Sequence, residues 1–360
     1  MLGQRLKLAR KKAGLSLRDL AERMEPHVSA QAISKYEADK MLPSSSVLVG
    51  LGRSLDVSLD FLMGGQVEEL CGIEFRKHSR TGAKDRARAE AIVLEHLEDY
   101  LAVEDILDAP PQANAFGDEV GLRVESFEQI DHAARKLRRS WKLGIDPIPS
   151  LSALLEEKGI RLVQADLPER FDGLTCTVRC AGERSSFPVV VVSSRASVER
   201  RRFTLAHELA HRIIASSDNP NISLEKAMNR FAGAFLAPEE HLCSEFGGGR
   251  HGTTYREILR VKHVYGMSAA AMLVRLGQTG LLPEGVVQYA FRTWARRWRT
   301  EEPEPLREGE GFDAFERPRR YKSLVWRAVG EEMISPVRAA QLLKKPLADV
   351  EAQIRGPEAR

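Results

Sequence analysis

The chain of 360 residues is poor in several residue types and patterns, and each deficit excludes a class of protein. It has only four cysteines, irregularly spaced, which excludes a disulfide framework and suits free thiols in a reducing cytosol. No apolar run approaches the roughly 20 residues that a membrane-spanning helix needs. The basic N-terminal residues lack the apolar stretch of a secretory signal. We therefore expect a cytoplasmic protein that does not enter a membrane.

Neither sign of charge dominates the chain. The 54 Lys and Arg residues exceed the 51 Asp and Glu residues by only three, so any contact with nucleic acid must come from a local patch. Apolar residues make up 43% of the chain, which is enough to form real cores. Because 360 residues exceed the usual size of one compact core, two or three domains are expected.

Two stretches have the composition of linkers, and they divide the chain. Residues 108–119 are rich in Pro, Ala and Asn, and residues 301–310 combine Pro with charge. The predicted fold class is multidomain, with α and α+β parts. The expected units are an all-α domain, a helical connector with a linker, an α+β domain and a small helical tail: residues 1–65, 66–119, 120–300 and 311–360.

Hydrophobic periodicity and capping residues predict the elements within these units. Residues 75–107 have a helical period and predict one or two long helices. Three strand-like runs then precede two helices of the α+β part. The runs are residues 160–164, 174–180 and 187–193, and the helices cover about 198–215 and 224–237. The tail predicts three short helices, with Ser335 capping the middle one.

The first 65 residues contain two short helices, 17–24 and 30–38, that form a plausible DNA-reading pair. Leu20 and Ile33 can fill the core that the helices share, which leaves the polar face of the second helix outside. On that face Gln31 can pair with adenine. The predicted contacts to DNA bases and phosphates are Arg18, Ser29, Ala30, Gln31, Ser34, Lys35 and Lys40. The alternative is a helical module that binds protein, such as an antitoxin-like dimer.

This N-terminal pattern resembles the Xre, or lambda-repressor-like, family. The resemblance implies binding to operator DNA as a homodimer, and it implies that Glu37 and Pro43 stabilise the fold. The chain departs from the family in the turn, where residues 25–27 read Glu-Pro-His. The stretches that carry the resemblance are residues 3–24, 28–44 and 55–64.

The central domain contains the run FTLAHELAH at residues 203–211, an HEXXH motif. His207 and His211 are four residues apart, so both imidazoles project from one face of a helix and suit a tetrahedral zinc ion. Glu208 can take a proton from a water molecule and later pass it to a leaving amine. The apolar flanks would bury the helix. The non-functional alternative is an exposed helix that carries both histidines on one face and binds no metal.

A catalytic zinc site needs a third protein ligand. Glu225 on the following helix is the best candidate, and Asn229, four residues on, lies on the same face and can orient the Glu225 carboxylate. Competing candidates are Asp218, Glu239, Glu240 and His241. Two histidines and one carboxylate accept Mn²⁺ as well as Zn²⁺.

Residues 145–282 resemble the ImmA/IrrE family of metallopeptidases. The family pattern E-x-x-A-N-x-F-A implies that Glu225 is the third zinc ligand. Ala210 and Met228 depart from the pattern, and the larger Met228 is expected to shift the helix that carries Glu225. The matching stretches are residues 147–163, 171–175, 202–211, 225–238 and 266–282.

The resemblance implies a gluzincin-like fold in which an edge strand, residues 187–193, pairs with an extended substrate. It also implies cleavage of a repressor or regulator protein in stress response or mobile-element control. Because a repressor-like domain shares this chain, the substrate could be the chain itself, another copy or a separate partner. The alternative is a non-proteolytic repressor or antitoxin with a structural or sensory zinc.

Weaker signals have bland explanations. Cys176 and Cys180 are predicted to be core thiols, because strand geometry places their Cα atoms about 13 Å apart. Residues 292–299 combine four arginines with two tryptophans and are predicted to form a solvated basic helix with buried Trp edges rather than a nucleic-acid contact. His251, Tyr255 and His263 could stabilise an oxyanion, but the sequence selects none of them.

Overall fold

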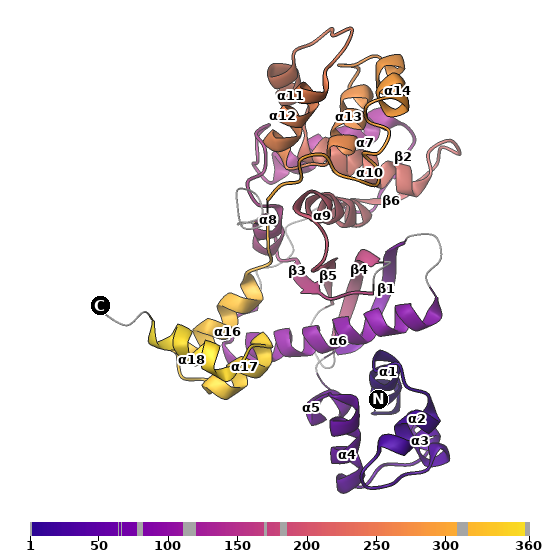
Figure 1. The fold of residues 1–360 in the computed structure, drawn as a ribbon, viewed down its shortest axis with the longest axis vertical. Coiled ribbons are helices and arrows are strands. Elements are labelled where there is room, and N and C mark those ends of the chain that lie inside the picture. Colours follow the sequence, from indigo (N-terminus) through magenta and orange to yellow (C-terminus); the bar gives the residue numbers. More distant parts are fainter. Residues whose placement is uncertain are drawn as a thin grey trace.

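In the computed structural model the chain forms a row of packed units (Figure 1). The helices of the N-terminal unit lie at one end, a mixed sheet lies in the middle, and a large group of helices forms the other end. The C-terminal helices project to one side. The chain is therefore a multidomain α and α+β protein, as predicted. No described helix is long and apolar enough to span a membrane. The structure describes residues 2–63, 65, 67–77, 82–110, 120–168, 171–180, 186–307 and 316–356.

The N-terminal unit is a bundle of five short helices. Ser16 and Ser29 cap the second and third helices through their side chains, and Ser44 caps the fourth. Leu20 and Ile33 are fully buried between the helices, which confirms the predicted shared core. The helices are α1 (Leu2–Lys12), α2 (Leu17–Arg23), α3 (Ala30–Glu37), α4 (Ser45–Leu55) and α5 (Leu59–Met63).

Four strands form a mixed sheet in the order β1-β4-β5-β3. Strand β4 is antiparallel to both of its neighbours, and β3 is parallel to β5. The strands are β1 (Val67–Lys77), β3 (Arg161–Ala165), β4 (Phe171–Cys180) and β5 (Phe187–Ser193). A separate parallel pair joins β2 (Leu122–Val124) to β6 (Ile214–Ser217).

The sheet corrects two sequence predictions. Residues 75–77 were expected to begin a helix, but they end β1, and the helix begins only at Ala83. Residues 187–193 were expected to be an edge strand, but β5 lies between β4 and β3, so the edges are β1 and β3. Every residue of β5 is buried, as a strand covered on both faces requires.

Helix α6 (Ala83–Ile106) runs along the sheet and joins three units (Figure 1). Its buried side chains share one core with the N-terminal helices and one face of the sheet. Near its middle, Glu95 and Glu98 form ion pairs with Lys12 and Arg5 of α1. Near its far end Glu104 pairs with Arg161 of β3 at 2.7 Å, with both side chains buried.

A second core lies on the opposite face of the sheet. There α9 packs against β4 and β5, α10 packs against α9, and α7 packs against α10. Gly173 of β4 allows the close approach of α9, because a Cβ atom there would lie 2.7 Å from a Thr204 methyl carbon. The helices are α7 (Phe127–Ser140), α8 (Leu151–Glu157), α9 (Val198–Ile213), α10 (Leu224–Leu236), α11 (Glu239–Phe246), α12 (Tyr255–Tyr265), α13 (Ala269–Gln278) and α14 (Glu284–Arg292).

The tail forms three helices, as predicted, and Ser335 caps the middle one. They are α16 (Arg320–Gly330), α17 (Pro336–Leu343) and α18 (Leu347–Arg355), and they form a third core with the end of α6. Just before α16, the buried Glu316 forms an ion pair with the buried Arg202 of α9. Residues 111–119 of the first predicted linker and residues 308–310 of the second lie outside the described residues.

Candidate metal centre

Helix α9 places two imidazoles at one point. His207 and His211 lie one turn apart on its buried side, and their Nε2 atoms are 3.2 Å apart. Zinc–nitrogen bonds of 2.0–2.1 Å at a tetrahedral angle place neighbouring nitrogens about 3.3 Å apart. The two rings therefore already have the separation that one shared tetrahedral ion requires.

Glu225 approaches the same point from α10. Ser223 caps this helix, so Glu225 lies in its first turn. One carboxylate oxygen lies 3.6 Å from His207 Nε2, and the ligand atoms of His207, His211 and Glu225 all lie within 4.8 Å of one another. Two nitrogens and one carboxylate oxygen form a donor set that suits zinc, and they leave a fourth position for water or substrate.

Burial differs sharply across this group. The His207 side chain is 1% exposed, whereas the Glu225 side chain is 69% exposed. The group is thus closed on the side of the helix core and open to solvent on the side of Glu225. Met228, which was expected to shift α10, is fully buried in the core and leaves Glu225 within reach of the histidines.

Asn229 contacts the other nitrogen of His207. The Nδ1 of His207 lies 3.1 Å from Oδ1 of Asn229, so an Nδ1–H group donates to the amide oxygen. That hydrogen bond selects the tautomer whose Nε2 lone pair is free to bind a metal. The arrangement corresponds to the orienting role expected for Asn229, although the contact is to a histidine and not to the carboxylate.

Glu208 is 1% exposed and follows His207 directly on α9. The apolar side chains of Leu205 and Leu209 on either side of this pair are fully buried. Water is therefore largely excluded from this side of α9, which strengthens electrostatic interactions there. A divalent cation held by the neighbouring histidines would favour the ionised form of Glu208.

The competing ligands are engaged elsewhere or lie apart. His241 Nδ1 lies 2.7 Å from the Tyr265 hydroxyl, and Glu239 lies 3.9 Å from Arg135. Among the described residues, His207, His211 and Glu225 form a cluster of three groups that could hold a metal ion. It includes none of Asp218, Glu239, Glu240 and His241.

The two cysteines and the three candidate oxyanion-stabilising residues lie in ordinary core or surface positions. Cys176 and Cys180 are buried core thiols, as predicted, and burial raises the pKa of Cys176 to about 12. Tyr255 stacks edge-on against Trp294, and His251 and His263 are exposed. No described contact ties these three residues to the metal group.

The prediction of a basic helix with buried Trp edges at residues 292–299 is partly wrong. The run forms turns after α14 rather than a helix, but Trp298 is buried as expected. Arg299 lies over the ring of Phe291 and lines a cavity of about 190 Å³ together with Asn229 and Phe203. This cavity lies beside the metal group, and sequence reasoning did not find it because its walls come from distant segments.

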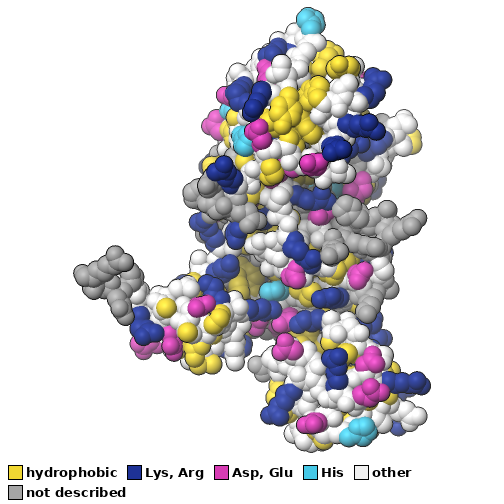
Figure 2. Space-filling model, viewed as in Figure 1, with side chains coloured by type: hydrophobic (Ala, Val, Ile, Leu, Met, Phe, Trp, Pro, Cys, Tyr) yellow, Lys and Arg dark blue, Asp and Glu magenta, His cyan; other side chains and the backbone are white. Residues whose placement is uncertain are grey.

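Helix α3 presents the predicted polar face to solvent. Ile33 and Tyr36 are buried, whereas Gln31, Ser34 and Lys35 are exposed. Of the other proposed DNA contacts, Ala30 is half-buried, and the exposed ones are Arg18, Ser29 and Lys40. On the face shown in Figure 2 acidic and basic side chains are interspersed over this unit. Any DNA affinity would therefore come from local contacts.

Glu37 has the stabilising position that the resemblance implied. Its two carboxylate oxygens accept hydrogen bonds of 2.6 and 2.7 Å from Nε and Nη2 of Arg10. The same guanidinium donates to the carbonyl of Leu15. This bidentate pair ties α1 to the end of α3, so Glu37 is turned inward and does not face DNA.

Comparisons with known proteins agree with this division of the chain. The helix-turn-helix family matches residues 6–62, and the IrrE N-terminal-like domain family matches residues 155–277, which include the whole metal group. The chain is 38% identical over 150 residues to the HTH-type transcriptional regulator ImmR of Bacillus subtilis. The matched region covers 42% of this chain and 95% of ImmR. No solved structure matches the chain significantly.

Proposed function

Because the chain belongs to the helix-turn-helix family of transcriptional regulators and carries an IrrE N-terminal-like peptidase domain, we propose that it binds operator DNA and cleaves a regulator protein with a zinc-dependent active site. The observation that carries the proposal is the convergence of His207, His211 and Glu225 beside the buried Glu208. A purely structural zinc would have no need of that fourth side chain.

In the proposed site, His207, His211 and Glu225 would hold the ion, and Mn²⁺ could replace Zn²⁺ there. The bound ion would polarise the scissile carbonyl and acidify a water molecule. Asn229 fixes the His207 tautomer through Nδ1. Glu208 accepts the proton of the attacking water on a carboxylate oxygen and then donates it to the leaving amine.

The proposed partners follow from the two domains. Gln31 of α3 would contact a base, Lys35 would contact guanine or a phosphate, and the helix pair would bind a two-fold operator as a homodimer. The substrate would be a repressor or regulator protein, which can include this chain. Cleavage would then switch gene expression, in a stress response or in control of a mobile element.

The decisive experiment compares wild type with Glu208→Gln. Glu240→Gln is the matched control, since Glu240 is exposed and lies outside the metal group. Each protein is assayed for bound zinc and is incubated with DNA and with candidate repressors from the same genetic neighbourhood, the chain itself included. We expect about one zinc per chain in all three, and a loss of cleavage of about 10²-fold or more in Glu208→Gln alone.

The alternative function is a DNA-binding repressor or antitoxin that uses zinc for structure or sensing. It predicts that Glu208→Gln holds zinc, binds DNA and represses as the wild type does, and that neither protein cleaves any candidate. If none of the three proteins binds metal, the proposed centre is wrong.

A further inference from the structure

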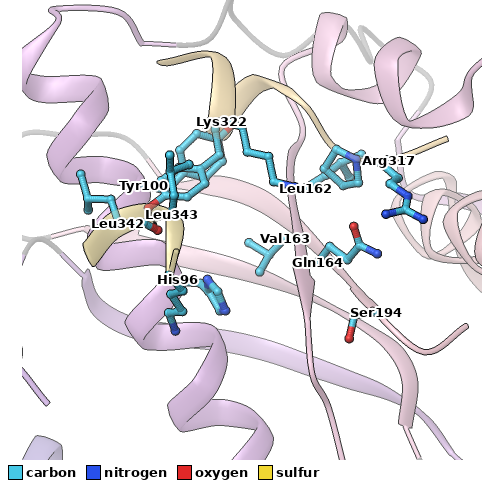
Figure 3. A pocket seen from close by; sticks show the side chains of 13 residues that line it. His96, Tyr100, Leu162, Val163, Gln164, Ser194, Arg317, Lys322, Leu342 and Leu343 are labelled. Carbon is cyan, nitrogen blue, oxygen red and sulfur yellow. Dashed lines mark hydrogen bonds between the residues drawn. The ribbon is translucent and has the colours of Figure 1, made fainter. Parts of the chain in front are cut away.

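A cleft of about 350 Å³, which none of the metal-group residues lines, lies where α6, the sheet and the C-terminal unit meet (Figure 3). Helix α6 contributes His96 and Tyr100, and strand β3 contributes Leu162, Val163 and Gln164. The remaining walls come from residues just after β5 and from the C-terminal unit. They are Ser194, Arg317, Pro318, Tyr321, Lys322, Leu342, Leu343 and Lys344. Its size is at the small end of the range for ligand pockets.

The floor of the cleft follows the edge of the sheet. Leu162, Val163 and Gln164 are consecutive, and consecutive strand residues point to opposite faces of a sheet. All three can line one cleft only if the cleft runs along the open edge of β3, which is the last strand of the sheet. An open edge presents backbone N–H and C=O groups, so the apolar floor carries hydrogen-bonding groups as well.

A buried donor also lines the cleft. Tyr100 is 1% exposed, and its hydroxyl has no hydrogen-bond partner among the described residues. A buried hydroxyl without a partner costs free energy, and a ligand acceptor would remove that cost. The ring of Tyr100 also packs edge-on against the ring of Tyr321, which holds Tyr100 in place.

The charged side chains that line the cleft are all basic. Arg317, Lys322 and Lys344 line it, and no described carboxylate does. Lys322 forms no ion pair with any described residue. Partial loss of hydration and then the like charges of Lys345 and Arg317 lower the pKa of Lys322. A lining with three basic side chains and no carboxylate favours an anionic ligand.

We propose that this cleft binds a small organic anion with an apolar body. The anionic group would lie between Lys322 and Arg317 at the mouth, and the apolar body would rest against Leu162, Leu342 and Leu343. An extended peptide is the less favoured occupant, because the cleft is short and the C-terminal unit closes one side of it (Figure 3).

The cleft has a direct connection to the DNA-binding unit. Lys344 lies 3.2 Å from one carboxylate oxygen of Glu95, and Lys12 of α1 contacts the other oxygen. An anion that attracts Lys344 would take it away from Glu95 and so change how Glu95 holds α1. The cleft is therefore placed to act as an effector site. Binding itself does not depend on the proposed peptidase activity.

The test uses the full chain and a pair of fluorescent probes. One is 1-anilinonaphthalene-8-sulfonate, an organic anion, and the other is N-phenyl-1-naphthylamine, which has the same rings without the sulfonate. We expect one saturable site per chain for the sulfonate, with at least tenfold weaker binding of the neutral probe. Equal affinity for the two probes would overturn the proposal, because the site would then recognise only an apolar body.

Three variants locate the site. Lys322→Gln should weaken sulfonate binding about tenfold and leave the neutral probe unchanged. Arg327→Gln is the matched control, because Arg327 lies on the same helix but pairs with Glu331 away from the cleft. Leu343→Trp should fill the cleft and abolish binding of both probes, with circular dichroism and zinc content as checks of folding. Unchanged affinity in Lys322→Gln and Leu343→Trp, or displacement by an unstructured peptide rather than by small carboxylates, would overturn the proposal.

Discussion

Replacement of Glu316 by Ala should destabilise the protein more than any surface change, because Glu316 is the buried link between the tail and α9. Its Oε1 accepts a hydrogen bond of 2.7 Å from the backbone of Ser152, and its Oε2 accepts one of 3.1 Å from Leu151. The Oε2 atom also pairs with Arg202, and both side chains are 0% exposed.

The magnitude follows from what Glu316→Ala leaves behind. Removal of one partner of a buried ion pair costs about 3–5 kcal/mol, because the other charge remains buried. Arg202 keeps its bonds to the carbonyls of Ile148 and Tyr265 but loses the carboxylate that balances its charge. The first turn of α8 also loses an acceptor, at about 1 kcal/mol. A total of about 4–6 kcal/mol should lower the melting temperature by about 10–20 °C for a domain of this size.

Calorimetry or thermal circular dichroism of the zinc-loaded protein measures the effect. The control is Glu331→Ala, since Glu331 pairs with Arg327 at 2.6 Å with both side chains about half exposed, a pair worth at most about 1 kcal/mol. Replacement of both partners, Arg202→Met with Glu316→Leu, should recover most of the loss. A decrease of less than about 3 °C in Glu316→Ala would refute the reasoning.

Two further predictions concern DNA and pH. Lys35→Ala should weaken binding to duplex DNA and reduce the slope of log affinity against log salt by about 1, whereas Lys7→Ala on α1 should change neither, as fluorescence anisotropy can show. Burial, followed by the charge of Lys344, lowers the pKa of His96 to about 4, with Glu95 opposing and Lys12 adding to the shift. As pH falls below about 6.5, His96 therefore takes up a proton in the unfolded chain before it does so in the folded protein. Between pH 7 and pH 5 the free energy of unfolding of the wild type should therefore decrease by about 2 kcal/mol more than that of His96→Asn. The raised pKa of Asp99 acts in the opposite sense but is common to both proteins, so it cancels in the difference measured by urea denaturation.

The local parts of the candidate site could be predicted from the sequence. The spacing of His207 and His211 determines their common face wherever the helix packs, since helical periodicity depends on neighbours in the chain alone. The caps of α2, α3 and α17 could be predicted for the same reason. Glu225 could be proposed as a ligand, but its 3.6 Å approach to His207 depends on how α10 packs against α9.

Non-local features could not be predicted in this way. The order of strands in a sheet is not encoded in any one strand, so the internal place of β5 was missed, although its unbroken apolar run was a signal of burial on both faces. Strand β1 mixes charged and apolar residues as an edge strand can, so its pattern resembled that of the helix after it. The Glu316–Arg202 pair joins residues 114 positions apart, and no local pattern indicates it.

Strand β1 and helix α6 determine where the chain can be divided. Both precede the peptidase-family segment in sequence, yet one completes its sheet and the other covers a whole face of that sheet. A fragment that begins at residue 120 would expose the edge of β4 and a wide apolar surface, so it should aggregate. A cut between Met63 and Val67 would instead leave the five N-terminal helices attached by non-covalent contacts alone, namely the core that they share with α6 and the ion pairs of Arg5 and Lys12. A single broken peptide bond before β1 would thus turn the N-terminal unit into a non-covalent subunit of the protein, whose release depends on the strength of that shared core.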